Sequence, residues 1–327
     1  MFTENEVLQV CKYYTNEDIT YELLGVSHNI VYKIICSVPF ILRITPFKHR
    51  NKNEILAELD FLNFLHQNGA NVNNPIMSLI NLSVVDCELN NETYYLTAFT
   101  LSDGLNWKER GDDDSRIGFI GQELGKIHRI SKQYNPCNVV FRRNSFDSQH
   151  LTKGFSVFKN YDIRVYNKYV SFINELKTLA KDNQKYGLTH GDFLFCNYNI
   201  THDNKVSVYD FDECEYSWFI SDIAVCIYYY LLGGNPAELI SKTDEAKHLM
   251  RLLMSGYIKE NLICNAEFEK IDLFFKQRDY ILLSTFIGRG ETELDWWEEL
   301  FIEGALDRIL NDKPFVDVKF NELNFHQ

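Results

Sequence analysis

A polar loop in the middle of the sequence constrains the fold of this chain more than any other feature. The loop carries His190, Asp192 and Asn197 in the spacing His-x-Asp-x-x-x-x-Asn. The Asp192 carboxylate can accept a proton from a hydroxyl group, and the Asn197 amide oxygen can bind a metal ion. Taken alone, the spacing also fits an ordinary loop between two strands, because His, Asp and Asn are common loop residues.

A hairpin is predicted directly after this loop. A short strand at 198–200 is followed by turn residues at 202–204 and by alternating apolar and polar residues at 206–208. Because a hairpin brings its two ends side by side, Asn197 and Asp210 can reach one ion. An oxygen-rich pair of this kind suits Mg²⁺ better than zinc.

A further acidic residue, Asp222, begins an apolar segment that continues to Leu232. Its place at the start of that segment is typical of a helix N-cap. Such a cap is compatible with a second role in holding a neighbouring loop.

The combined pattern resembles the superfamily of aminoglycoside phosphotransferases and choline kinase-like enzymes. It contains a His-Gly-Asp-x4-Asn loop, a strand end with the residues Tyr209-Asp-Phe-Asp212 and an Asp before Ile-Ala. The resemblance implies an α+β, two-lobed protein-kinase-like fold, with a small antiparallel β-sheet lobe and a larger, mainly helical lobe. It also implies an enzyme that transfers the γ-phosphoryl group of ATP, with GTP as an alternative donor, to a hydroxyl group of a small molecule.

Site residues follow from the same resemblance. Asp192 is the expected catalytic base, and His190 is included with it as a candidate catalytic residue. Asn197 and Asp210 are expected to hold Mg²⁺. Asp222 is expected to be structural and to anchor the catalytic loop through hydrogen bonds.

Three nucleotide-binding residues are predicted in the first turn of the N-terminal part, namely Gly25, Ser27 and Asn29. Backbone N–H groups of this turn would cover the ATP phosphates. Related enzymes often carry two glycines here, whereas this sequence has Val26 where the second glycine is common. The plain alternative for Gly25 is a turn residue without a ligand.

Arg43 stands where kinases usually carry a lysine that contacts the α and β phosphates. Glu58 matches the family glutamate that pairs with this cation, and a guanidinium suits both phosphate and carboxylate. The alternatives are a solvent-facing Arg43 and a solvated Glu58. Phe99 begins the segment expected to border the adenine.

The coarse element pattern supports two lobes. A β-rich nucleotide-binding lobe is expected at 1–99, a hinge at 100–102 and a helical catalytic and substrate lobe at 103–327. The first lobe is predicted to hold a five-stranded sheet, with strands at 20–24, 30–36, 40–45, 82–87 and 94–99, and a helix at 53–66. In the second lobe, the segment 135–154 is predicted to be irregular. Helices are predicted at 117–128, 161–179, 222–232, 243–260, 266–287 and 291–310. Thr243 is the predicted N-cap of the helix at 243–260, and His128 is interpreted as a packed core histidine.

The composition of the chain limits the classes of binding partner and the cellular compartment to be expected. The net charge of −13 argues against nucleic acid or an anionic membrane as the main partner, since both require basic surfaces. The eight cysteines form no Cys-x-x-Cys pair and are interpreted as reduced thiols. The first residues show no secretory signal and no apolar run is long enough to span a bilayer, so a cytoplasmic protein is expected. The oligomeric state stays open.

The acceptor is expected to be a small molecule with a hydroxyl group, and a cationic acceptor is one hypothesis. Acidic residues follow the strand that ends at Asp210, such as Asp212 and Glu215, and a run of acidic and aromatic residues lies at 295–299. Such side chains would suit an ammonium group if they faced a cleft. Two other functions stay open. One is a non-catalytic nucleotide- or partner-binding module on the same fold, and the other is a metal-dependent hydrolase.

Overall fold

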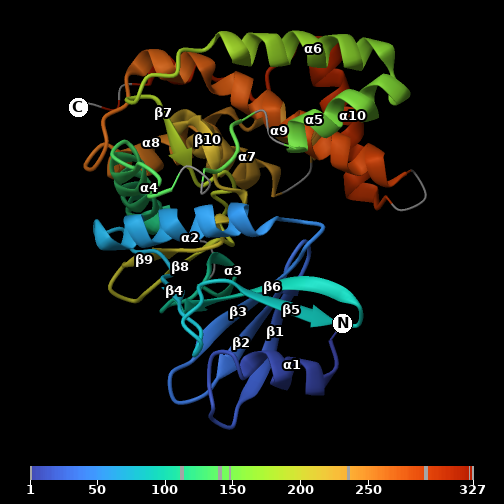
Figure 1. Ribbon diagram of the computed structural model, residues 1–327. Coiled ribbons are helices and arrows are strands. Elements are labelled where there is room, and N and C mark those ends of the chain that lie inside the picture. The colour runs from blue at the N-terminus through green and yellow to red at the C-terminus, as the bar shows by residue number, and fades with distance from the viewer. Residues whose placement is uncertain are drawn as a thin grey trace. The chain divides into compact units, whose positions relative to one another are not determined.

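The computed structural model describes residues 2–110, 114–138, 142–146, 149–233, 236–290, 294–323 and 325 (Figure 1). The chain forms two compact units, called here the sheet unit and the helical unit. The sheet unit comprises Met1–Leu105, Tyr134–Arg143 and Tyr198–Asp212. The helical unit comprises Asn106–Gln133, Asn144–Asn197 and Glu213–Gln327. The domain boundaries expected from the sequence stay a prediction.

A six-stranded antiparallel sheet forms the centre of the sheet unit, in the order β1-β2-β3-β6-β4, with β5 also paired to β6. Its strands are β1 (Thr20–Val26), β2 (Ile30–Ile35), β3 (Phe40–Pro46), β4 (Pro75–Ile76), β5 (Val85–Leu89) and β6 (Glu92–Thr100). The predicted five strands are therefore one too few. The missing strand, β4, has only two residues, too few to show an alternating pattern.

Two capped helices also belong to this unit. Helix α1 (Glu4–Cys11) begins with a capping box between Thr3 and Glu6, and its apolar residues join a core cluster with residues of the sheet. Helix α2 (Lys52–Gln67) has a second capping box at Asn51 and is followed by Gly69 with φ of 92°. The sequence prediction of a helix at 53–66 is confirmed because caps and apolar spacing agree there.

The helical unit contains a β-pair and most of the helices. The strands β7 (Tyr186–Thr189) and β10 (Glu215–Trp218) pair antiparallel. The described helices are α3 (Trp107–Arg110), α4 (Ile117–Ser131), α5 (Gln149–Tyr161), α6 (Ile163–Thr178), α7 (Phe219–Leu232), α8 (Thr243–Tyr257), α9 (Ile271–Arg289) and α10 (Trp296–Leu310). The chain thus has the predicted α+β architecture, with an antiparallel sheet lobe and a larger helical lobe.

Several predicted helix bounds are wrong. Helix α5 occupies part of the segment predicted to be irregular. The segment 266–287 divides into a 3₁₀ turn at Asn265–Lys270 and α9. Helix α10 begins only after Asp295, whose side chain caps it, and residues 291–293 lie outside the described residues. Thr243 is the first residue of α8 and not its N-cap, which is Lys242.

Helices α4 and α8 approach closely enough for backbone to touch backbone. A Cβ atom added at Gly121 would lie 1.9 Å from the carbonyl oxygen of Leu253, and one at Gly256 would lie 1.6 Å from the oxygen of Gly118. Glycine is therefore required at this crossing for space. No helix among the described residues is both long and apolar enough to cross a membrane.

Candidate active site

The catalytic loop predicted from the sequence follows β7 directly and runs from His190 to Asn197. Strand β7 is held by β10, with Thr189 opposite Glu215. Gly191 has φ of 82°, and a Cβ there would lie 2.1 Å from the carbonyl oxygen of Glu213. A glycine is thus needed for the turn that begins the loop.

Asp222 anchors this loop from within α7. Its carboxylate accepts hydrogen bonds from the backbone N–H groups of His190 at 2.8 Å and Gly191 at 2.9 Å, and it lies 3.0 Å from His128 Nε2. Burial alone would raise the pKa of Asp222, but the hydrogen bond and charge of His128, together with His190, lower it below its ordinary value. The predicted anchoring role is confirmed by these contacts, whereas the predicted N-cap is wrong because Trp218 holds that place.

His128 is fully buried, as predicted for a core histidine. Its Nδ1 atom lies 2.9 Å from the hydroxyl oxygen of Tyr257, and its Nε2 atom faces Asp222. A histidine bonded on both ring nitrogens fixes the orientation of the acid that holds the loop.

Asp192 lies in this loop with a raised proton affinity. Burial, with smaller contributions from Glu213 and Asp222, raises the pKa of Asp192 to about 6, although Arg278 opposes the shift. Arg278 Nη1 lies 3.9 Å from Asp192 Oδ1, and its Nη2 donates to the carbonyl oxygen of Gly191. A carboxylate with this pKa is still ionised at neutral pH and is more basic than an ordinary Asp.

Asn197 and His190 complete the loop. The Nδ2 atom of Asn197 donates to the backbone oxygen of Asp192 at 2.9 Å. This hydrogen bond uses the amide nitrogen, and Oδ1 is the atom of this side chain that could bind a metal ion. The His190 ring is fully buried, and its Nδ1 accepts from the backbone N–H of Asp192 at 3.2 Å. This geometry makes His190 a support for the Asp192 backbone, and its catalytic role stays a prediction.

Asp210 lies in the sheet unit, after the hairpin of β8 (Tyr198–Ile200) and β9 (Val206–Val208). The hairpin forms as predicted, with Tyr198 opposite Val208. Asp210 has φ of 65°, a left-handed conformation that is uncommon outside glycine and often marks functional sites. The next residue, Phe211, is fully buried and packs against Phe61 of α2 at a ring distance of 6.0 Å.

Arg43 and Glu58 form a buried, two-bond ion pair between β3 and α2. Their N–O distances are 2.8 and 2.7 Å, and the guanidinium carbon lies 5.0 Å from the centre of the Phe99 ring. Burial opposes the charge of Arg43, but Glu58, Asp212 and Asp210 raise its pKa above the ordinary value. The predicted Arg43–Glu58 pair is present, so neither side chain is the exposed alternative.

The first turn differs in detail from the expectation. Gly25 lies inside β1, and the turn itself consists of 27–29, where the N–H of Ser27 donates to the carbonyl oxygen of Asn29 at 2.9 Å. Asn29 is buried and its amide bridges two groups, donating to Asp212 at 3.2 Å and accepting from Thr45 at 2.8 Å. The binding roles of these three residues stay predictions.

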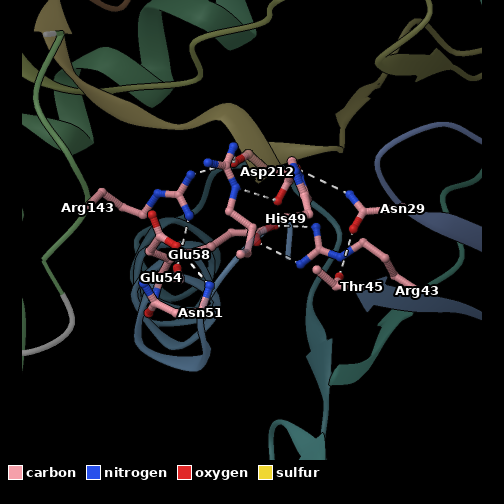
Figure 2. Close-up of polar contacts among 10 residues, drawn as sticks. Asn29, Arg43, Thr45, His49, Asn51, Glu54, Glu58, Arg143 and Asp212 are labelled. Carbon is pink, nitrogen blue, oxygen red and sulfur yellow. Dashed lines mark hydrogen bonds and ion pairs between the residues drawn. The ribbon is translucent and has the colours of Figure 1, made fainter. Parts of the chain in front are cut away.

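Asp212 is the centre of a polar cluster that sequence reasoning missed (Figure 2). Its carboxylate lies 2.6 Å from His49 Nε2 and 3.3 Å from Arg50 Nε, and its backbone oxygen accepts from Arg50 and Arg143. Burial disfavours ionisation of Asp212, but the hydrogen bond from His49 and the charges of Arg43 and Arg50 outweigh it and hold the pKa well below its usual range.

These contacts change the interpretation of two acidic residues. Asp212, which one hypothesis placed against a cationic acceptor, is instead in contact with His49 and Arg50 of the sheet unit. Asp295, in the second acidic run, accepts from the backbone of Trp297 and Glu298 as a helix cap. No local sequence pattern predicted the partners of Asp212 or the contact of Arg278 with the catalytic loop, because the residues in contact are far apart in the sequence.

Comparison with known proteins agrees with this architecture. The model of the phosphotransferase enzyme family matches residues 23–248. Amicoumacin kinase of Bacillus subtilis (strain 168) is 27% identical over 286 residues, which cover 86% of this chain and 84% of that protein. The resemblance inferred from the sequence is therefore confirmed.

Two solved structures share the fold. Amicoumacin kinase hAmiN, in complex with AMP-PNP, Ca²⁺ and Ami, superposes with a TM-score of 0.87 at 23% identity, covering 99% of this chain and 98% of that chain. A microcompartment-associated aminopropanol kinase gives 0.76 at 18% identity, covering 95% of this chain and 98% of that chain.

Proposed function

The chain belongs to the phosphotransferase enzyme family, as a kinase of small-molecule hydroxyl groups, and on this premise we propose that it uses ATP as donor with Asp192 as catalytic base. The observation that carries the proposal is the catalytic loop. Its first two N–H groups are fixed by Asp222, and its carboxylate has a pKa near 6 beside Arg278.

In the proposed reaction, the acceptor oxygen forms a bond to the γ-phosphorus while the bond from that phosphorus to the β-γ bridging oxygen breaks. Asp192 orients the acceptor hydroxyl and takes its proton. Phosphoryl transfer needs little covalent help and depends on positioning and electrostatics. A loop held by buried hydrogen bonds supplies that positioning, because Asp192 need not be ordered when the acceptor binds.

Asn197 and Asp210 are the proposed Mg²⁺ ligands. Their oxygens have the chemistry that Mg²⁺ prefers, and the Asn197 amide already directs its nitrogen to the Asp192 backbone. The two residues flank the β8–β9 hairpin, whose register pairs Tyr198 with Val208. When bound, the ion would neutralise charge that develops on the phosphates.

The sheet unit supplies the proposed nucleotide contacts. The Nε atom of Arg43 is buried and has no hydrogen-bond partner among the described residues. A phosphate oxygen would satisfy this donor, while Glu58 keeps the other guanidinium nitrogens in place. The Phe99 ring, whose centre lies 5.0 Å from the guanidinium carbon, would limit the positions that the Arg43 side chain can take in the site. We further propose that Gly25, Ser27 and Asn29 cover the phosphates as part of the first turn.

The acceptor is proposed to be a hydroxyl compound that carries an amine, as the names of two similar proteins suggest. Amicoumacin and aminopropanol are the first compounds to test. Because Asp212 already pairs with His49 and Arg50, a cationic acceptor would depend on other acids, such as Glu215.

A coupled assay for ADP release with each acceptor tests the function, together with mass spectrometry for one added phosphoryl group. Wild type should release ADP only with Mg²⁺ and a true acceptor. Asp192→Asn should lower the rate by about 10²–10⁴-fold, the usual contribution of a general base. Asp210→Asn should abolish turnover.

The matched control is Asp203→Asn, which removes a carboxylate from the exposed turn of the same hairpin and should keep normal rates. Full activity of Asp192→Asn would refute the assigned role. ADP release absent with every acceptor, despite nucleotide binding, would favour the non-catalytic binding module.

A further inference from the structure

A guanidinium group lies beside the proposed catalytic base, inside the helical unit. The Nη1 atom of Arg278, in α9, is 3.9 Å from Oδ1 of Asp192. That distance is too long for a hydrogen bond between the two groups, so each can still bind an oxygen atom of a ligand. The side chains keep 13% (Arg278) and 28% (Asp192) of their surface exposed, so a small molecule can reach both.

The position of this guanidinium is fixed from two sides. Its Nη2 atom donates to the carbonyl oxygen of Gly191, in the catalytic loop itself, and its central carbon lies 5.9 Å from the centre of the Tyr229 ring. Among the described residues, Arg278 donates a hydrogen bond only from Nη2, and its Nη1 atom is not sealed from solvent. Nη1 is therefore an oriented donor, and a ligand that accepts from it loses little affinity to the ordering of this side chain.

The surroundings of this pair are acidic, which limits the charge that a ligand can carry there. Glu213, Glu215 and Asp222 all lie close enough to influence the charge of Asp192 or Arg278. A ligand carboxylate would meet these negative charges, whereas a neutral carbonyl oxygen would accept from Nη1 without adding another. An amine elsewhere in the acceptor is compatible with these acids.

We propose that Arg278 determines acceptor specificity by donating from Nη1 to a neutral carbonyl oxygen on the carbon atom next to the reacting hydroxyl group. Hydrogen bonds of about 2.8 Å from two groups 3.9 Å apart can meet a hydroxyl and a carbonyl oxygen on neighbouring carbon atoms. The preferred acceptor is therefore an α-hydroxy amide, since an amide has the strongest acceptor oxygen among common neutral carbonyl groups. This inference rests on the proposed function, because it takes Asp192 as the group that binds the acceptor hydroxyl.

Isothermal titration calorimetry with three matched compounds tests this preference, with AMP-PNP and Mg²⁺ present. Isoserinamide, isopropanolamine and isoserine share an aminomethyl group and a secondary hydroxyl group. They differ only in the third substituent, which is a carboxamide, a methyl group or a carboxylate. Wild type should bind isoserinamide about 10–100-fold more tightly than isopropanolamine, the contribution of one hydrogen bond from a charged donor. Isoserine should bind more weakly than isoserinamide.

Arg278→Met removes the donor and should make the affinities for isoserinamide and isopropanolamine about equal. A role confined to holding the catalytic loop would instead weaken both compounds by the same factor and leave their ratio unchanged. Isopropanolamine lacks the carbonyl contact, so a pH profile recorded with it measures the effect of Arg278 on the ionisation of Asp192 separately.

Two further variants complete the design. Arg289→Met is the matched control, the same change on the same helix at an arginine that pairs with Glu298, and it should keep the full preference for isoserinamide. Arg278→Lys keeps a cationic donor and should keep a preference of several-fold, which tests the proposal even if Arg278→Met fails to fold.

Several outcomes would overturn the proposal. These are equal binding of isoserinamide and isopropanolamine by wild type, tighter binding of isoserine, no binding of isoserinamide, or an unchanged preference in Arg278→Met. Failure of the proposed function looks different, because wild type would then bind isoserinamide with the expected preference and release no ADP. Turnover of isoserinamide and isopropanolamine with equal kcat/KM would keep the kinase function and refute this specificity.

Discussion

At the scale of single residues, the pKa of Asp192 decides the pH range in which the proposed base can act. Burial raises that pKa to about 6, and the positive charge of Arg278 limits the rise. Because the base must be ionised, the rate should fall as pH decreases through about 6. Without the charge of Arg278, the carboxylate would hold its proton more strongly.

Arg278→Gln should therefore move the acidic limb of the kcat/KM profile to higher pH. We expect a shift of about one pH unit, which corresponds to about tenfold lower activity at a fixed pH on that limb. The profile of kcat/KM against pH measures this directly, because it reports ionisations of the free enzyme.

The matched control is Arg289→Gln, the same change on the same helix at an arginine that pairs with Glu298. Its acidic limb should stay where it is in wild type. If Arg278→Gln lowered the rate equally at every pH, its role would be limited to holding the Gly191 carbonyl.

At the scale of elements, the close crossing of α4 and α8 holds His128 and Tyr257 opposite each other. Gly121→Ala would place a methyl group 1.9 Å from the Leu253 carbonyl oxygen, so one helix must move. We expect a loss of about 3 kcal/mol in the free energy of unfolding, as overpacking against backbone is expensive. Urea denaturation followed by circular dichroism measures it.

Gly288→Ala is the control for this prediction. It adds the same methyl group inside α9, where the nearest atom, Lys153 Cε, lies at an ordinary 3.6 Å. The helix propensity of alanine should then leave stability unchanged or raise it by about 0.5–1 kcal/mol. Equal destabilisation of both variants would show that the α4–α8 contact is not the cause.

At the scale of the whole molecule, nucleotide binding should raise the melting temperature in a manner that depends on Mg²⁺. A ligand at a hundred times its dissociation constant stabilises the folded state by about 2.7 kcal/mol. Thermal denaturation with ATP and with GTP, each with and without Mg²⁺, measures the effect and distinguishes the two donors.

Asp210→Asn should weaken the Mg²⁺-dependent part of this melting shift, and Asp203→Asn should keep it. A shift of equal size without Mg²⁺ would contradict the proposed metal ligands. A melting shift with GTP but not with ATP would mean that GTP is the phosphoryl donor. The proposed role of Asp192 would not change.

Local sequence signals determined much of the framework. The loop spacing from His190 to Asn197, the β8–β9 hairpin and the capped helix α2 all follow from residues close together in the chain. Arg43 and Glu58 were paired through family resemblance, and the structure shows that pair. Such features depend on turns, caps and periodicity, which are encoded over a few residues.

Only the tertiary structure decided which hydrogen-bond and ion-pair partners the charged side chains find in segments far away in the sequence. Asp212 is paired with His49 and Arg50, and Arg278 reaches the catalytic loop from α9, although no local pattern distinguishes these residues from solvated charges. Burial and long-range contact shift the ionisation and hydrogen bonding of a charged group, and both arise only when segments far apart in the sequence pack together.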